Sequence, residues 1–167
     1  MISEVWLHFG VVILVQFIFF FVCAAYYKKL DEMPTLLLRG IFIGIAIGLL
    51  YDHLLGRYLG LFSYELGFGF PFLLLNAGLS YGLFVASTLL LKKVSTIHFV
   101  IWLSALVAVY EITNYLFPVW RYEFPLSLAL LFVLCLVGYS SGALLASLIA
   151  HKLFNHQFIL KLSNVKN

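Results

Sequence analysis

The chain has 167 residues, of which 64% are hydrophobic and 10% are charged, and its mean hydropathy is +1.09. A soluble globular domain carries about 25% charged residues, so this composition excludes a soluble domain and favours one membrane-embedded domain over residues 1–167. The formal net charge of +3 predicts no nucleic-acid partner, because the basic residues lie between the apolar runs rather than in one patch.

Five apolar runs are long enough to cross about 30 Å of hydrocarbon as helices. The amino terminus has Glu4 and no basic stretch, and the apolar run that follows is too long for a signal-peptide core, so we expect this run to remain as a helix. The predicted fold class is an all-α polytopic membrane protein. In chain order we expect transmembrane helices at 5–27, 34–56, 66–91, 94–116 and 124–150, followed by a tail at 151–167.

The basic residues predict the orientation of these helices. Eight of the ten fall on one side of the predicted membrane, and the positive-inside rule assigns that side to the cytoplasm. We therefore expect a multi-pass protein of the cell (inner) membrane, with its amino terminus outside and its carboxyl terminus cytoplasmic. Only Arg57 and Arg121 fall on the outer side. The inner set is Lys28, Lys29, Arg39, Lys92, Lys93, Lys152, Lys161 and Lys166.

Two segments of the chain share one pattern. Each places a Tyr-acid pair near the end of an apolar run, then an aromatic-x-Tyr-Glu element, then a Phe-Pro step before a run with Gly-x-x-x-Gly. We predict that helices two-three and four-five are parallel internal repeats, related by a rotation along the membrane normal. The copies comprise Tyr51, Asp52, Tyr64, Glu65, Phe70, Pro71, Gly78 and Gly82, and Tyr110, Glu111, Tyr122, Glu123, Phe124, Pro125, Gly138 and Gly142.

Small residues recur every four positions along three of the predicted helices. Residues four apart share a helix face, and a face without side chains lets another helix approach closely. We therefore expect helix crossings at these stripes. They comprise Gly40, Gly44, Gly48 and Gly56, with Asp52 in line between the last two, then Gly78, Gly82 and Ala86, then Gly138, Gly142, Ala146 and Ala150.

Asp52 and Glu111 are the candidate catalytic residues. A carboxylate near the bilayer centre costs roughly 2.5–3.5 kcal/mol on insertion scales, and helix packing does not require one. The alternative is that each acid reaches the headgroups or pairs with Arg57 or Arg121. The candidate substrate-binding residues share the predicted depth of the acids: Tyr51, His53, Tyr64, Asn76, Tyr110, Asn114, Trp120 and Tyr122.

Some of these polar residues have a structural alternative. His53 suits a membrane interface, and Asn76 and Asn114 suit hydrogen bonds between helices. Cys23 and Cys135 both lie in apolar runs and are expected to be buried thiols rather than a disulfide. The residues offer no metal-ligand spacing and no phosphate loop, so we expect no metal and no cofactor.

Around Asp52 the chain resembles the lycopene cyclase domain of membrane carotenoid-modifying proteins. Tyr51-Asp52 is similar to that family's Trp-Asp step, Phe62-Ser63-Tyr64 to its aromatic element, and Gly67, Gly69 and Pro71 to the residues that follow. The family's acids after the Pro are replaced by residues 72–75, which are all apolar, and Asn76 is the first polar residue. The resemblance implies a small, helical, internally repeated protein that acts on an isoprenoid.

Three functions fit these residues. The first is an enzyme or binder for an isoprenoid-like or other long apolar substrate, in which an acid protonates a polyene and aromatic rings stabilise the cation. The second is a small transporter, or the substrate-binding subunit of one, whose acids hold a cation or polar solute. The third is an assembly or accessory protein. Expected partners are membrane lipid, an apolar small molecule, and a second copy or another membrane subunit. An apolar cavity favours the first function, a wet one the second, and lipid-facing acids the third.

Overall fold

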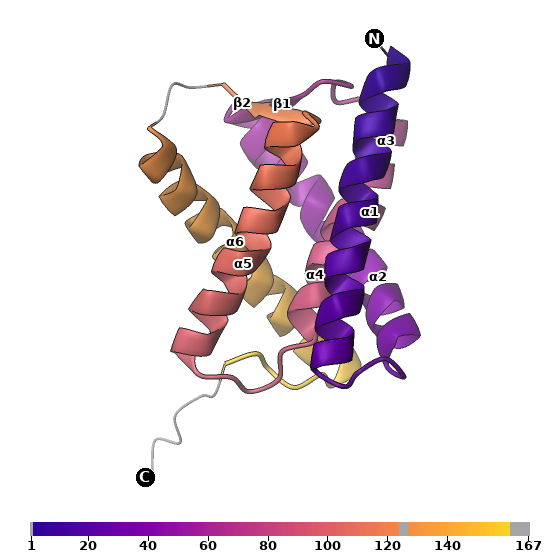
Figure 1. Ribbon diagram of the computed structural model, residues 1–167, viewed down its shortest axis with the longest axis vertical. Helices are drawn as coiled ribbons and strands as arrows, with labels where there is room; N and C mark the ends of the chain where they lie inside the picture. Colours follow the sequence, from indigo (N-terminus) through magenta and orange to yellow (C-terminus); the bar gives the residue numbers. More distant parts are fainter. Residues whose placement is uncertain (1, 124–126, 161–167) are drawn as a thin grey trace.

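The computed structural model describes residues 2–123 and 127–160, and the chain folds as a helical bundle (Figure 1). Within the described residues, five helices are long and apolar enough to cross a membrane. They begin and end at Ser3–Tyr26, Met33–Tyr58, Phe70–Leu89, Thr96–Leu116 and Ala129–Phe154. This confirms the predicted number of helices and the order in which they follow one another.

The second and third of these helices each contain a π-helical segment, which the sequence analysis did not predict. The elements in chain order are α1 (Ile2–Tyr26), α2 (Met33–Tyr51), η1 (Asp52–Tyr58), β1 (Phe62–Tyr64), α3 (Phe70–Asn76), η2 (Ala77–Tyr81), α4 (Gly82–Leu89), α5 (Thr96–Leu116), β2 (Trp120–Tyr122) and α6 (Leu128–Phe154), where η1 and η2 are the π-helical segments.

Several helix ends differ from the predicted ones because capping residues set them. The third helix begins at Phe70 rather than at 66, since Gly67 has a φ of +69° and Gly69 is extended before Pro71 in the first turn. Ser95 caps α5 by accepting from the backbone N–H of His98. Ser127 caps α6 in the same way, so this helix begins at 128 rather than 124; residues 124–126 lie outside the described part of the chain.

The connections after η1 and after α5 also differ from the prediction, which placed no strand in this protein. β1 and β2 form an antiparallel pair in which Phe62 lies opposite Tyr122, Ser63 opposite Arg121, and Tyr64 opposite Trp120. In Figure 1 the pair lies at the same end of the bundle as the amino terminus. The two connections that carry the aromatic-x-Tyr elements are therefore joined to each other.

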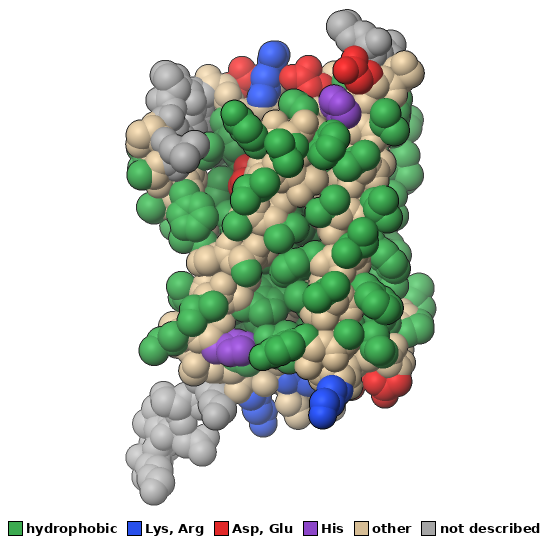
Figure 2. Space-filling model, viewed as in Figure 1, with side chains coloured by type: hydrophobic (Ala, Val, Ile, Leu, Met, Phe, Trp, Pro, Cys, Tyr) green, Lys and Arg blue, Asp and Glu red, His purple; other side chains and the backbone are tan. Residues whose placement is uncertain are grey.

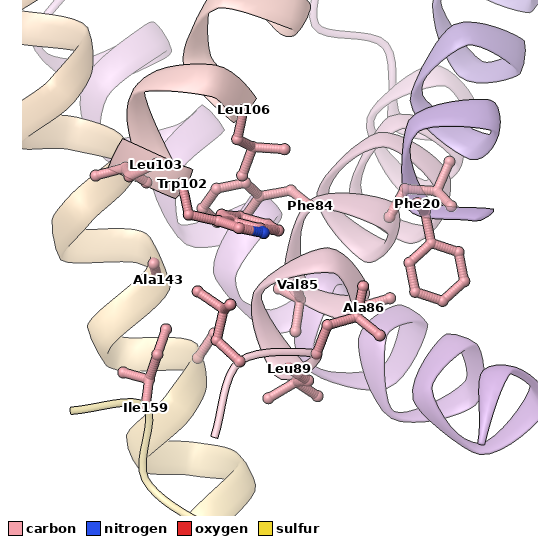
Figure 3. Close-up of a cluster of buried hydrophobic side chains, with 14 of the residues drawn as sticks. Phe20, Phe84, Val85, Ala86, Leu89, Trp102, Leu103, Leu106, Ala143 and Ile159 are labelled. Atoms are coloured by element: carbon pink, nitrogen blue, oxygen red, sulfur yellow. The ribbon is translucent and has the colours of Figure 1, made fainter. Parts of the chain in front are cut away.

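The core lies where α4 packs among α1, α5 and α6 (Figure 3). Phe20 of α1, Leu106 of α5 and Ala143 of α6 are fully buried around it. Lipid is as apolar as these side chains, so close packing rather than water exclusion holds such helices together in a membrane.

The tightest crossing joins α2 to α4 and η2, as the glycine stripe predicts. A Cβ added at Gly40 would lie 2.4 Å from the carbonyl oxygen of Gly82, and one at Gly44 would lie 2.5 Å from the Gly82 nitrogen. The expected stripe on α6 is different. Gly138 has nothing within 4 Å of an added Cβ, and at Gly142 the nearest atom, in the Phe84 ring, is 3.4 Å away. The prediction of a close crossing at these two glycines is therefore wrong.

Charged side chains gather at the two ends of the molecule, and apolar ones cover its middle (Figure 2). At the end opposite the strands, Glu32 accepts hydrogen bonds from Lys29 and from Lys92, the latter at 2.9 Å. These two lysines hold the pKa of Glu32 below its ordinary value. The predicted tail is partly structured, because α6 continues to Phe154 and the Val94 nitrogen then donates to the carbonyl of Ile159 at 2.8 Å.

Candidate functional site

The first candidate acid, Asp52, is fully buried at the start of η1. One of its carboxylate oxygens, Oδ1, accepts hydrogen bonds from the Tyr64 hydroxyl at 2.7 Å and the Tyr81 hydroxyl at 3.1 Å. The Asn76 side-chain amide donates to the Tyr64 oxygen at 2.9 Å. Four groups from η1, β1, α3 and η2 thus form one hydrogen-bonded set around the carboxylate. We call it the Asp52 cluster.

The second candidate acid, Glu111, has a matching arrangement on α5. Its Oε1 accepts from the Tyr122 hydroxyl at 2.9 Å and from the Tyr139 hydroxyl at 3.0 Å. The Tyr122 oxygen also lies 3.3 Å from the Cys135 sulfur. We call this set the Glu111 cluster. The tyrosines follow Asp52 by 12 and 29 residues and Glu111 by 11 and 28 residues, so the two clusters use nearly the same spacing.

The two π-helical segments carry two members of the Asp52 cluster. Asp52 is the first residue of η1, and Tyr81 is the last residue of η2. A π-helical turn widens the helix and changes the direction of the side chains that follow it, and such turns occur often at functional sites. The Glu111 cluster has no such segment, because α5 and α6 are regular across it.

A cavity of about 440 Å³ lies beside both clusters. Its wall includes all four tyrosines that contact the acids, together with Asn76 and Cys135, but neither Asp52 nor Glu111. Each acid is therefore separated from the cavity by the tyrosine hydroxyl groups that donate to it. Most of the remaining wall is aliphatic or aromatic. Its aromatic members are Tyr51, Phe62, Tyr64, Tyr81, Phe84, Tyr110, Trp120, Tyr122 and Tyr139.

The other two tyrosines of the wall are also hydrogen-bonded. Tyr110 donates to the backbone carbonyl of Ser80 at 3.3 Å, and the Tyr51 hydroxyl lies 2.7 Å from that of Ser141. The rings of Tyr110 and Tyr139 meet edge to face, with 5.9 Å between their centroids. Hydrogen bonds and ring contacts thus fix the directions of these side chains before any ligand is present.

Two of the ten predicted site residues lie outside this arrangement. His53 is exposed and is absent from the cavity wall. The Asn114 side chain holds the turn before β2: its oxygen accepts from the backbone N–H groups of Val119 and Trp120, and its amide donates to the Trp120 carbonyl. Asn114 therefore has a structural role. The other eight lie in the cavity wall or directly behind it.

Neither carboxylate has a basic partner within the described ranges. Arg121 lies 3.4 Å from Glu123 and 4.0 Å from Glu65, and the remaining ion pairs join Glu32 to lysines. The alternative in which Arg121 pairs with Glu111 is therefore wrong. The second oxygen of Asp52, Oδ2, is buried and has no hydrogen-bond partner among the described atoms.

The strand tyrosines remain protonated in this environment. Burial raises the pKa of the Tyr64 hydroxyl well above its usual range, and the neighbouring Tyr81 and Asp52 add to that effect. Burial and Glu111 raise the pKa of Tyr122 in the same direction. Both groups are consequently neutral hydrogen-bond donors, and their protons point toward the carboxylates.

Sequence reasoning missed Tyr81, Tyr139 and Cys135. The available signal was the repeat itself, because Tyr81 and Tyr139 occupy almost the same offset from the two acids. Tyr81 and Tyr139 both lie in apolar runs, where a Tyr is usually interpreted as a core or interfacial residue. In the part of the chain that the structure describes, no three His, Cys, Asp or Glu side chains form a group that could hold a metal ion.

Comparison of the chain with protein-family models, with curated proteins and with solved structures gives no match.

Proposed function

We propose that this protein spans the cell membrane and binds an isoprenoid-like or other long apolar molecule in the cavity between the Asp52 and Glu111 clusters. The observation that carries the proposal is the cavity itself, with a volume of about 440 Å³ and a wall dominated by aromatic and aliphatic side chains. Pockets of about 300–1,000 Å³ with a few convergent polar groups are typical of small-molecule sites.

The clusters also support a proton-triggered reaction on such a molecule. In a cyclisation, a carbon-carbon double bond takes up a proton, a second double bond attacks the resulting cation, and a proton is lost as a new double bond forms. The substrate is isomerised, so no oxidant or cofactor is consumed. Because the carboxylates lie behind the wall, this reaction would require the acid to be protonated first, so that its O–H donates to a tyrosine oxygen and the tyrosine O–H turns toward the cavity. The proton would then pass through that hydroxyl, and the aromatic rings would stabilise the cation.

The two other functions have less support from the site. A polar solute or hydrated ion would need a wetter wall than the aliphatic and aromatic side chains provide. An accessory protein that docks a partner helix through its acids would carry them on its lipid-facing surface. Asp52 is fully buried, and the Glu111 side chain is partly buried with its Oε1 bonded to two tyrosines.

We also propose that helices two-three and four-five are internal repeats. Each cluster joins one acid to two tyrosines at nearly equal offsets. The strand register supports a two-fold relation, because the middle residues Ser63 and Arg121 face each other while Phe62 and Tyr64 lie opposite Tyr122 and Trp120. A two-fold axis through this strand pair would exchange the two hairpins.

The proposed orientation places the strand pair outside the cell. The connections after α1 and α4 lie at the opposite end of the molecule (Figure 1). They carry Lys28, Lys29, Lys92 and Lys93, and the positive-inside rule assigns such connections to the cytoplasm.

Mass spectrometry of molecules that co-purify in mild detergent tests the proposed function. The matched variants are Gly138→Leu and Gly10→Leu, since an added Cβ meets nothing within 4 Å at either position, but only Gly138 lies in the cavity wall. We expect a long apolar molecule to co-purify with the wild type and with Gly10→Leu, and to be lost from Gly138→Leu. Equal recovery from both variants would show that the molecule binds elsewhere.

A further inference from the structure

The four tyrosines that contact the acids present oxygen lone pairs and ring faces to a ligand, rather than hydroxyl protons, while the acids are ionised. Tyr64 and Tyr81 donate to Asp52, and Tyr122 and Tyr139 donate to Glu111. Each of these hydroxyl protons is therefore directed at a carboxylate behind the wall. What these four side chains leave for the cavity is oxygen lone pairs and the negative faces of their rings.

The charge of the site points in the same direction. Two carboxylates lie behind one wall, and no ion pair among the described residues includes either of them. Arg39 of α2 is engaged with other groups: its guanidinium lies over the Phe154 ring, 5.2 Å from the centroid, and 3.5 Å from His156. Carboxylates inside a membrane are normally paired with an opposite charge, and a bound ligand can supply it.

From these features we propose that the ligand carries a positive charge, as a long-chain amine or quaternary ammonium compound whose head lies between the Asp52 and Glu111 clusters. The proposal rests on the proposed function and specifies the class of molecule for that cavity. Aromatic rings attract such a head by cation–π interaction, which is worth about 0.5–2 kcal/mol per contact and is strongest for Trp. Trp120 of the wall, together with the four tyrosines, supplies these rings.

The remainder of the wall suits the apolar tail. Leu131, Leu134 and Val137 of α6 line the cavity, and Leu134 and Val137 are also exposed on the outer surface of the helix bundle. A chain that leaves the head region along α6 therefore meets aliphatic side chains until it reaches lipid. An amphiphile with a cationic head and one long tail matches both parts of the cavity.

The test compares two probes that differ only in their heads, hexadecyltrimethylammonium and hexadecanol, titrated into the purified protein in an uncharged maltoside detergent. Binding is followed by Trp fluorescence, with Trp120→Phe to identify the signal from the cavity, and by the shift in unfolding temperature. We expect the wild type to bind the cation at least about tenfold more tightly than the alcohol. Gly138→Leu should bind neither probe, and Gly10→Leu should bind both as the wild type does.

A second comparison, between variants of the acids, tests whether the two carboxylates cause the preference for the cation. The double variant Asp52→Asn/Glu111→Gln keeps the shape of the site and its rings, so it should retain a cation preference that is at least about threefold smaller than that of the wild type. Glu32→Gln, which removes an acid at the opposite end of the molecule, should keep the full preference. If the double variant does not fold, each single variant should show a reduced preference instead.

The two proposals fail in different ways. If the wild type binds both probes equally in the cavity, the charge proposal is wrong and the proposed function stands. If neither probe binds and no long apolar molecule co-purifies, the proposed function is wrong as well. A preference for the cation that is undiminished in the double variant would contradict recognition by the carboxylates.

Discussion

Replacing Gly44 by Ala should loosen the crossing of α2 over η2 and α4 and disturb the Asp52 cluster. The added Cβ would lie 2.5 Å from the Gly82 nitrogen, 2.6 Å from its Cα and 2.8 Å from the Tyr81 carbonyl carbon, and ordinary contact begins near 3.4 Å. All three atoms belong to the backbone, so the helices must separate by roughly 1 Å. Overpacking of this kind costs about 1–3 kcal/mol, and the better helix propensity of Ala returns up to about 1 kcal/mol.

The expected net loss is about 1–2 kcal/mol, or a fall of about 2–8 °C in unfolding temperature. Thermal unfolding in detergent, followed by circular dichroism, measures it. Gly10→Ala is the matched control, because nothing lies within 4 Å of its added Cβ and it lies in a regular part of α1. Gly44→Ala should also weaken ligand binding, since Tyr81 moves relative to Asp52. A Gly44→Ala protein as stable as the Gly10→Ala protein would refute the close crossing.

Three further predictions concern the Glu111 cluster, the opposite end of the bundle and the orientation. Tyr122→Phe removes one hydrogen bond to Glu111 and should cost about 1–3 kcal/mol of stability, whereas Tyr115→Phe, which alters a side chain that is 84% exposed, should leave it unchanged. Since lysines lower the pKa of Glu32 below its ordinary value of 4.5, its contribution is present above pH 4.5 and is lost as the pH falls through the folded-state pKa. At pH 7 the unfolding temperature of Glu32→Gln should therefore be at most about 2 °C below that of the wild type. In strong acid the two unfolding temperatures should be equal. Ser63→Cys should react with an impermeant thiol reagent in intact cells, and Ser95→Cys should not; the reverse pattern would overturn the orientation.

The helices could be predicted from the sequence because their length and apolar composition are strong signals. Their ends depend on single residues that hydropathy does not distinguish. Gly67 with its positive φ and the cap at Ser127 move two helix starts by four residues each from the predicted positions. Strands of three residues, such as β1 and β2, show no usable alternation, and they form because two distant connections meet.

The candidate site could be predicted in part because an acid within an apolar run is rare and the same sequence pattern surrounds both acids. Spacing identifies which residues share a helix face, but not what packs against that face. Gly138 follows the small-residue spacing and yet faces a cavity. Asn114 lies one turn after Glu111 and yet binds the turn before β2. The roles of Tyr81 and Tyr139 depend on neighbours from other helices, which the sequence does not specify.

The strand pair has a consequence for how a molecule reaches the cavity. Phe62 and Tyr64 of β1, with Trp120 and Tyr122 of β2, form part of the wall and cover the cavity at that end of the bundle. If the protein spans a membrane as proposed, a molecule would reach the cavity beside α6, sideways from the bilayer, past side chains such as Val137, which lines the cavity and is exposed. A molecule that uses this path dissolves in the lipid first, so occupancy is governed by its mole fraction in the membrane rather than by its concentration in water. Diluting the cells or vesicles at a fixed ratio of ligand to lipid would then leave the bound fraction unchanged.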